Sequence, residues 1–143
     1  MPIQVTTKMR ILKPTHVVFE ALVDPEKISG YWWSRGSGRL EQGKAITFWY
    51  DEYNAQVDLT MVAVEANRQI VFRWPNGHTV TMRLQAIEPA STVVEVTEVG
   101  WDEADPGLIP ALLDNKEGWV YMLTCLKAYL EFGVNRLRAG LAK

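Results

Sequence analysis

The sequence has 143 residues, of which 48% are hydrophobic and 22% charged, and its formal net charge is −2. This balance excludes nucleic acid and anionic membrane as main partners, because both require a basic patch. No segment is apolar for long enough to cross a membrane and the N-terminus lacks the apolar region of a signal peptide, so we expect a cytoplasmic protein without membrane insertion. The single Cys125 cannot form an internal disulfide.

The first third of the chain predicts one strand followed by two short helices. Residues 3–12 alternate as a strand does, and residues 15–23 place apolar side chains at helical spacing. Asp24 and Pro25 then predict a second helix that ends near Gly30, because Asp caps helices and Pro suits the first helical position.

The middle of the chain has a hydrophobic period of two. Ile70, Phe72 and Trp74, for example, alternate with Val71 and Arg73. Several such runs lie between residues 44 and 99, and turn residues separate them at 52–55, 66–68, 75–77 and 88–91. The pattern predicts an antiparallel meander with one apolar face, which needs a cover.

That cover is predicted to be a long helix near the C-terminus. Asp114 can cap it while Glu117 reaches back, so we expect the helix to begin near Asn115. Gly133 ends the run. The apolar residues at helical spacing are Trp119, Met122, Leu123, Leu126 and Leu130.

This order of elements resembles the START-like helix-grip superfamily (SRPBCC), and within it the Aha1-like (activator of Hsp90 ATPase homologue) single-domain group. The resemblance implies an α+β fold in which a curved antiparallel sheet wraps around a long C-terminal helix, with two short helices after the first strand. It implies one domain over residues 1–143 and a role in stress response. The motifs that carry it are Phe19-x-Ala21-Leu22-x-Asp24-Pro25, Trp32-Trp33, Glu41-x-Gly43, Gly100-Trp101, Gly118-Trp119 and Leu126-Lys127-x-Tyr129-Leu130-Glu131-x-Gly133.

A curved sheet that holds one helix leaves a cavity between them where side chains do not fill the space. We therefore predict binding of a small, largely apolar ligand, aromatic or lipid-like. Residues 101–114 are interpreted as a lid, and Trp33 and Trp119 as structural. The aromatic residues near turns and strand ends, which we expect to line the cavity, are Trp32, Tyr50, Trp74 and Trp101.

Glu98 is the predicted polar residue of this site. Strict alternation places it on the same face as Val94 and Val96, toward the helix. The alternative is that the strand ends or bulges at Val99-Gly100 and Glu98 turns to solvent. In the first case it would orient a polar group of the ligand, with an arginine such as Arg35 nearby.

Two other functions are consistent with the sequence. An enzyme like the polyketide cyclases and dehydratases of this fold would need an internal acid or base, for which Glu98, Tyr50 and His78 are the candidates. A protein-interaction module would contact a chaperone or form a homodimer. The larger co-chaperones of the family carry an additional N-terminal domain that contributes to activation, and we expect none here, which argues against Hsp90 activation. We expect no cofactor and no metal, because His16, His78 and Cys125 are far apart in the sequence.

Overall fold

The alternating segments pair as a seven-stranded antiparallel sheet within residues 2–142, which the computed structural model describes. The order is β1-β7-β6-β5-β4-β3-β2, so β1 and β2 lie at the two edges. Register shifts in β4 and β6 bend the sheet, because a bulge curves the strand that contains it. The strands are β1 (Gln4–Ile11), β2 (Arg35–Gly36), β3 (Ala45–Tyr50), β4 (Ala55–Glu65), β5 (Gln69–Arg73), β6 (Thr79–Glu88) and β7 (Ser91–Val99).

The two predicted short helices follow the first strand. They are α1 (Thr15–Val23) and α2 (Pro25–Ile28). The Asp24 side chain accepts a hydrogen bond from the Glu26 N–H at 3.0 Å, and Pro25 occupies the first helical position, as the sequence predicts. A short 3-10 turn, η1 (Asp51–Tyr53), joins β3 to β4.

The long C-terminal helix begins earlier than the sequence predicts. It is α3 (Leu108–Phe132), with Gly107 at its N-cap, so Asp114 lies inside the helix rather than at its start. Pro110 is tolerated because the first turn of a helix needs no N–H donor there. The predicted lid is therefore wrong as a separate element: only residues 101–107 form a loop, and Ile109 and Leu113 point to solvent.

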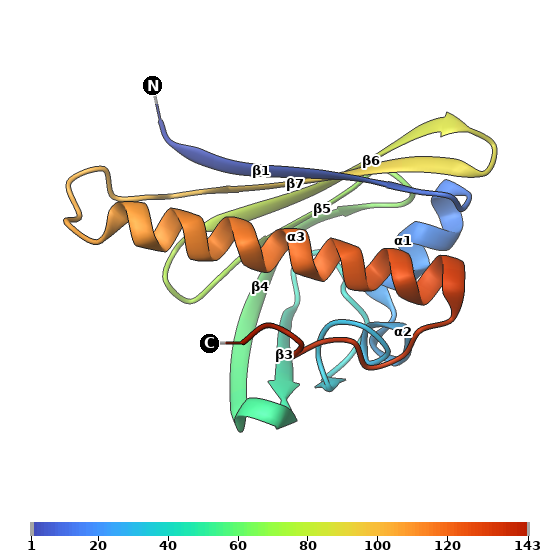
Figure 1. Ribbon diagram of the computed structural model, residues 1–143, viewed down its shortest axis with the longest axis horizontal. Coiled ribbons are helices and arrows are strands. Elements are labelled where there is room, and N and C mark those ends of the chain that lie inside the picture. The colour runs from blue at the N-terminus through green and yellow to red at the C-terminus, as the bar shows by residue number, and fades with distance from the viewer. Residues whose placement is uncertain (1, 143) are drawn as a thin grey trace.

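Figure 1 shows α3 lying along one face of the sheet, with α1 and α2 near its C-terminal end. The core lies between these layers. Leu123 and Leu126 of α3 are 0% exposed, as are Phe48 of β3 and Phe72 of β5. This arrangement confirms the predicted α+β helix-grip fold. None of the helices within residues 2–142 has the length and apolarity needed to span a membrane.

The free edge of β1 is covered by side chains of α3. Lys116 donates a hydrogen bond to the Thr6 carbonyl, and Lys127 donates one to the Arg10 carbonyl at 2.7 Å. At the end of the strand, the Leu12 N–H donates to the Glu131 carboxylate at 2.9 Å. Backbone groups that face no neighbouring strand thus have partners on the helix.

Glu131 makes this helix-to-edge contact dependent on pH. Its side chain is only 7% exposed, and desolvation opposes its ionisation, but hydrogen bonds from Leu12 and Lys127 outweigh this and hold its pKa below the ordinary 4.5. A carboxyl group whose pKa is lower in the folded than in the unfolded protein stabilises the fold fully at pH values above its unfolded-state pKa. This stabilisation is lost as the pH falls through the folded-state pKa. We expect Glu131→Gln to lower the urea midpoint at pH 7 and the two midpoints to converge below pH 4.5. A constant difference across this range would contradict the assignment.

Candidate functional site

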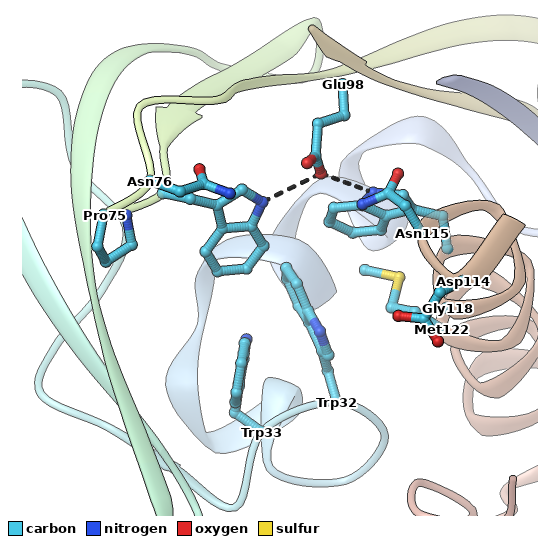
Figure 2. Close-up of a pocket in the computed structure, with 11 residues that line it drawn as sticks. Trp32, Trp33, Pro75, Asn76, Glu98, Asp114, Asn115, Gly118 and Met122 are labelled. Carbon is cyan, nitrogen blue, oxygen red and sulfur yellow. Dashed lines mark hydrogen bonds between the residues drawn. The ribbon is translucent and has the colours of Figure 1, made fainter. Parts of the chain in front are cut away.

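A cavity of about 560 Å³ opens between α3, the turn after β5 and the segment after α2 (Figure 2). This volume falls within the range of about 300–1,000 Å³ that is typical of small-molecule sites. The lining combines large aromatic rings with a few polar groups. Its residues are Trp32, Trp33, Trp74, Pro75, Asn76, Glu98, Asp114, Asn115, Gly118, Trp119 and Met122.

Four of these residues, Trp32, Trp33, Trp74 and Trp119, form a closed ring of contacts that we call the tryptophan quartet. Successive ring centroids lie 5.7, 6.2, 6.3 and 5.8 Å apart around the quartet. These are tilted or edge-on arrangements, which aromatic pairs prefer. The quartet draws on three segments far apart in the sequence, and the cavity that it lines is called the quartet cavity below.

Glu98 holds two members of the quartet in place. It is 2% exposed, and its Oε1 accepts hydrogen bonds from the Trp74 Nε1–H at 3.1 Å and the Trp119 Nε1–H at 3.0 Å. Its Oε2 lies 2.7 Å from His78 Nδ1. A buried carboxylate needs such donors, because an unpaired charge is costly away from water. Figure 2 shows the two indoles converging on this carboxylate.

The local sequence explains how these groups meet at one end of the sheet. Pro75-Asn76-Gly77 turns the chain between β5 and β6, so that the Trp74 N–H donates to the His78 carbonyl at 3.0 Å. Glu98, on the neighbouring strand β7, pairs with Val80 of β6. Gly100 follows with a φ of 110°, and a Cβ there would lie 3.1 Å from the Cα of His78. Glycine at this position therefore lets β7 end against His78.

Two polar atoms of the lining have no hydrogen-bond partner among the described residues. They are the Nε1–H of Trp33 and the Oδ1 of Asn115, and both atoms are buried. Buried polar atoms are normally paired, so each such exception requires an explanation. One is a donor and the other an acceptor, and both belong to residues that line the quartet cavity.

A second cavity, of about 280 Å³, adjoins the first along α3 and shares Trp32, Asp114, Gly118 and Met122 with it. Residues of the C-terminal segment line its other side, among them Arg138 and Leu141. Tyr50 also lines this cavity. Burial and the neighbouring Tyr53 raise the pKa of Tyr50 to about 12, which keeps its hydroxyl neutral.

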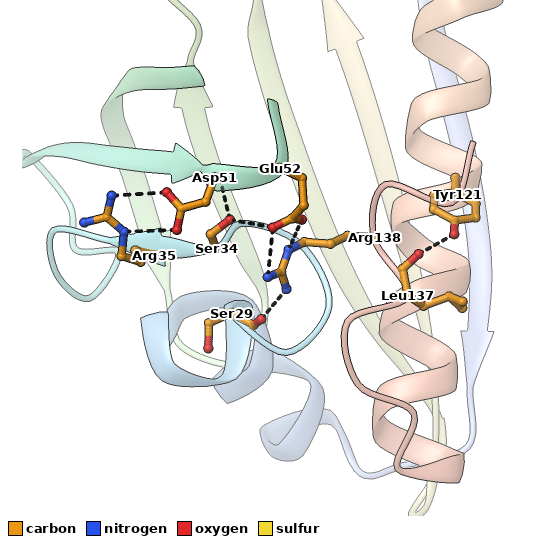
Figure 3. Close-up of polar contacts among 8 residues, drawn as sticks. All are labelled: Ser29, Ser34, Arg35, Asp51, Glu52, Tyr121, Leu137 and Arg138. Carbon is orange, nitrogen blue, oxygen red and sulfur yellow. Dashed lines mark hydrogen bonds and ion pairs between the residues drawn. The ribbon is translucent and has the colours of Figure 1, made fainter. Parts of the chain in front are cut away.

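Polar contacts hold the C-terminal segment in place where it lines the second cavity (Figure 3). Arg138 pairs with Glu52 at 2.7 Å and donates to the Ser29 carbonyl. The Tyr121 hydroxyl donates to the Leu137 carbonyl. The segment after α3 is therefore fixed to both η1 and α3.

The sequence-predicted residues lie in three places. Trp32, Trp74 and Glu98 line the quartet cavity, whereas Tyr50 lines only the second one. Trp101 lines neither cavity: its ring lies 4.5 Å from that of His78, and its Nε1–H donates to the Glu98 carbonyl at 3.0 Å. The prediction that Trp101 lines the cavity is therefore wrong: the residue contacts His78 and the backbone of Glu98 instead.

Arg35 is not near Glu98, contrary to the sequence-based expectation. It pairs with Asp51 at 3.2 Å (Figure 3) and lies 4.8 Å from the Trp49 ring centroid. Its guanidinium is held at the far side of β3, because Arg35 is paired with Trp49 across the β2–β3 ladder.

Several lining residues are not predicted by the sequence pattern. Trp33 and Trp119 have the spacing of structural residues, yet both line the quartet cavity. Asn115, Gly118 and Met122 lie at helical spacing around Trp119 within the helix that the sequence already predicts, so the face of Trp119 was the signal that could have identified them. Nothing in the local pattern indicates that adjacent Trp32 and Trp33 face the same space, because the segment after α2 is irregular.

Among the described residues, Cys125 and the acidic groups are not arranged as a metal site. Within residues 2–142, no three His, Cys, Asp or Glu side chains are placed to hold a metal ion together. Cys125 is 1% exposed, and burial raises the pKa of its thiol, which keeps it in the weakly nucleophilic neutral form.

Comparisons with solved structures show the same architecture elsewhere. Protein SSP2350 from Staphylococcus saprophyticus is 47% identical, with a TM-score of 0.85 over 94% of this chain and 96% of that one. The Aha1 dimer from Colwellia psychrerythraea is 20% identical (TM-score 0.79, 92% and 98% covered). DynU16, from the dynemicin biosynthetic locus, is 22% identical (TM-score 0.80, 92% and 48% covered). The latter two likenesses show the fold alone.

A family model decides the relationship. No curated protein matches the chain. The model described as "Activator of Hsp90 ATPase homolog 1-like protein" matches residues 13–131, which include α1, the whole meander and nearly all of α3. The chain belongs to the Activator of Hsp90 ATPase homolog 1-like family.

Proposed function

We propose that this protein binds a small, largely apolar molecule, aromatic or lipid-like, in the quartet cavity. The observation that carries the proposal is the tryptophan quartet around an open volume of about 560 Å³. The four rings contact one another, and all of them line this open volume. Burial of apolar ligand surface there would contribute about 25 cal/mol per Å² before the costs of ordering.

Gly118 supports this proposal from the helix side. It lies inside α3, where glycine costs roughly 0.5–1 kcal/mol relative to alanine. A Cβ at this position would meet nothing within 4 Å. The chain thus keeps a destabilising residue at a position where any side chain would extend into the cavity.

The hydrogen bonds of Glu98 favour binding over catalysis. A carboxylate has about four lone-pair positions; two indole N–H groups occupy positions on the Glu98 Oε1, and His78 Nδ1 lies 2.7 Å from its Oε2. A general base must accept a proton from a substrate, and these contacts leave little capacity for that. We assign Glu98 the role of fixing the two indoles, with no reaction.

The proposal is tested with the neutral fluorescent probe N-phenyl-1-naphthylamine. Gly118→Leu should fill the cavity and weaken binding at least tenfold, while Gly118→Ala should give a smaller loss and raise the free energy of unfolding by about 0.5–1 kcal/mol. Val120→Leu, on the exposed side of the same helix, is the matched control and should bind as the wild type does. Native mass spectrometry of freshly purified protein would identify a co-purifying molecule.

An unchanged affinity in Gly118→Leu would place the probe outside the quartet cavity and contradict the proposal. In that case the protein-interaction alternative, a chaperone contact or a homodimer, would gain support. We further propose that the protein works as one domain in the cytoplasm, where the free, buried Cys125 needs no disulfide partner.

A further inference from the structure

The second cavity owes one of its walls to the C-terminal segment. Ala139 and Leu141 of that segment line it, together with Trp32 and Met122, which also line the quartet cavity. We propose, on the basis of the function proposed above, that the two cavities hold one elongated, uncharged ligand. An aromatic ring system occupies the quartet cavity, and an alkyl chain attached to it runs into the second cavity.

Two tyrosine hydroxyls hold the backbone of the C-terminal segment in place. Figure 3 shows the Tyr121 hydroxyl donating to the Leu137 carbonyl, and the same oxygen accepts a hydrogen bond from the Gly140 N–H. The Tyr50 hydroxyl accepts one from the Ala139 N–H. A Cβ at Gly140 would overlap the Tyr121 hydroxyl, so only glycine lets the chain pass this close. Particular residues therefore specify the path of the segment along the second cavity.

The remaining anchors of the segment are also polar. The Arg136 N–H donates to the Gly30 carbonyl at 2.8 Å, and Arg138 pairs with Glu52 at 2.7 Å. None of these contacts uses the apolar side chains of Ala139 and Leu141. Those side chains are left to line the cavity.

The two cavities meet along α3 at Gly118, which lines both of them. A Cβ at this position would meet nothing within 4 Å, so the helix surface is open where the cavities join. The quartet cavity offers the faces of large rings, which suit a flat aromatic group. The second cavity adds the aliphatic groups of Met122, Ala139 and Leu141, and methionine adapts to irregular apolar shapes, which suits a flexible chain.

The charged groups of both linings favour an uncharged ligand, because each of them already has a partner. Arg138 pairs with Glu52, and Asp114 also has an interaction partner. Glu98 accepts hydrogen bonds from two indoles. A charged ligand would have to break one of these contacts or lose its hydration without a counter-ion, which is costly.

The test uses a homologous series of neutral ligands, from para-ethylphenol to para-octylphenol. Each competes with N-phenyl-1-naphthylamine for the wild-type protein. We expect every added methylene to raise the affinity about fourfold until the chain fills the second cavity, and the affinity to level off beyond that length. The length at which it levels off reports the size of the second cavity.

Two variants change that size in opposite directions. Ala139→Leu should fill the second cavity and weaken binding of para-octylphenol about tenfold, while para-ethylphenol binds as it does to the wild type. Leu141→Ala should enlarge the cavity, so that the affinity continues to rise for one or two further methylenes. Ala142→Leu and Leu137→Ala make the same two changes in the same segment outside the lining and should leave the length dependence unchanged.

The lengthening in Leu141→Ala is decisive, because a displaced segment would shorten the length dependence but only a larger cavity extends it. The wild-type length dependence in Leu141→Ala, or in Ala139→Leu, would overturn the inference. Displacement of the probe by para-ethylphenol would still support the proposed function in that case. A probe that no alkylphenol displaces, and that Gly118→Leu does not affect, would overturn both.

Discussion

Leu126→Ala is expected to lower the free energy of unfolding by about 2–5 kcal/mol, because the removed side chain is fully buried and its neighbours cannot collapse into the space. Leu126 is 0% exposed at the centre of the α3 face that covers the sheet. Urea midpoints measured at constant pH give the change, provided that the slope of the transition is preserved.

Leu113→Ala is the matched control for this experiment. It changes the same residue type on the same helix, but Leu113 is 67% exposed, so its loss should remain within about 0.5 kcal/mol. A loss below about 1 kcal/mol for Leu126→Ala would mean that α3 does not bury this position against the sheet.

Glu98→Ala should be the second strongly destabilising change. It removes the acceptor for two indole N–H groups and the partner of His78. A buried donor that loses its acceptor costs roughly 1–3 kcal/mol, and Trp119 is 5% exposed, whereas Trp74 and His78 can reach water more easily. We expect a total loss of about 3 kcal/mol in urea unfolding.

Comparison with Glu98→Gln separates the hydrogen bonds from the charge. The amide oxygen of the introduced glutamine can still accept from both indoles, so this variant should remain within about 1 kcal/mol of the wild type. Near-ultraviolet circular dichroism, which reports the packing of the quartet, should change in the alanine variant and stay unchanged in the glutamine variant. Equal losses in both variants would show that the charge, rather than the acceptor, stabilises this end of the sheet.

The sequence predicts the sheet well because alternation is a local signal. Once Val94 is known to face inward, alternation predicts that every second residue of β7, up to Glu98, also faces inward. The same alternation continues from β5 to Trp74, which directly follows that strand. The predicted start of α3 is wrong for an equally local reason. Asp114 and Glu117 have the spacing of a helix cap, but they lie inside α3. The helix starts earlier because its first turn accommodates Pro110. The sequence alone does not distinguish a cap motif at the start of a helix from the same residues in its interior.

The site is less predictable because a cavity depends on what side chains fail to fill. Trp33 and Trp119 have the spacing of ordinary core residues, and their role depends on the absence of a side chain at Gly118. Trp101, after β7, and His78, before β6, contact each other although they are far apart in the sequence, and the local pattern gives no indication of this. The partners of Glu98 come from the connection between β5 and β6 and from α3, so only the assembled fold brings them together.

The helix side chains along the edge of β1 also determine how copies of this chain can associate. An unpaired strand edge is a template on which another strand can add, and proteins often block it with lysine. Lys116 and Lys127 already hold carbonyls of β1, and β2, at the opposite edge, has only two residues. A second copy would therefore meet the outer face of the sheet or the exposed side of α3. Growth of a continuous intermolecular sheet through β1 would first require the C-terminal helix to release it.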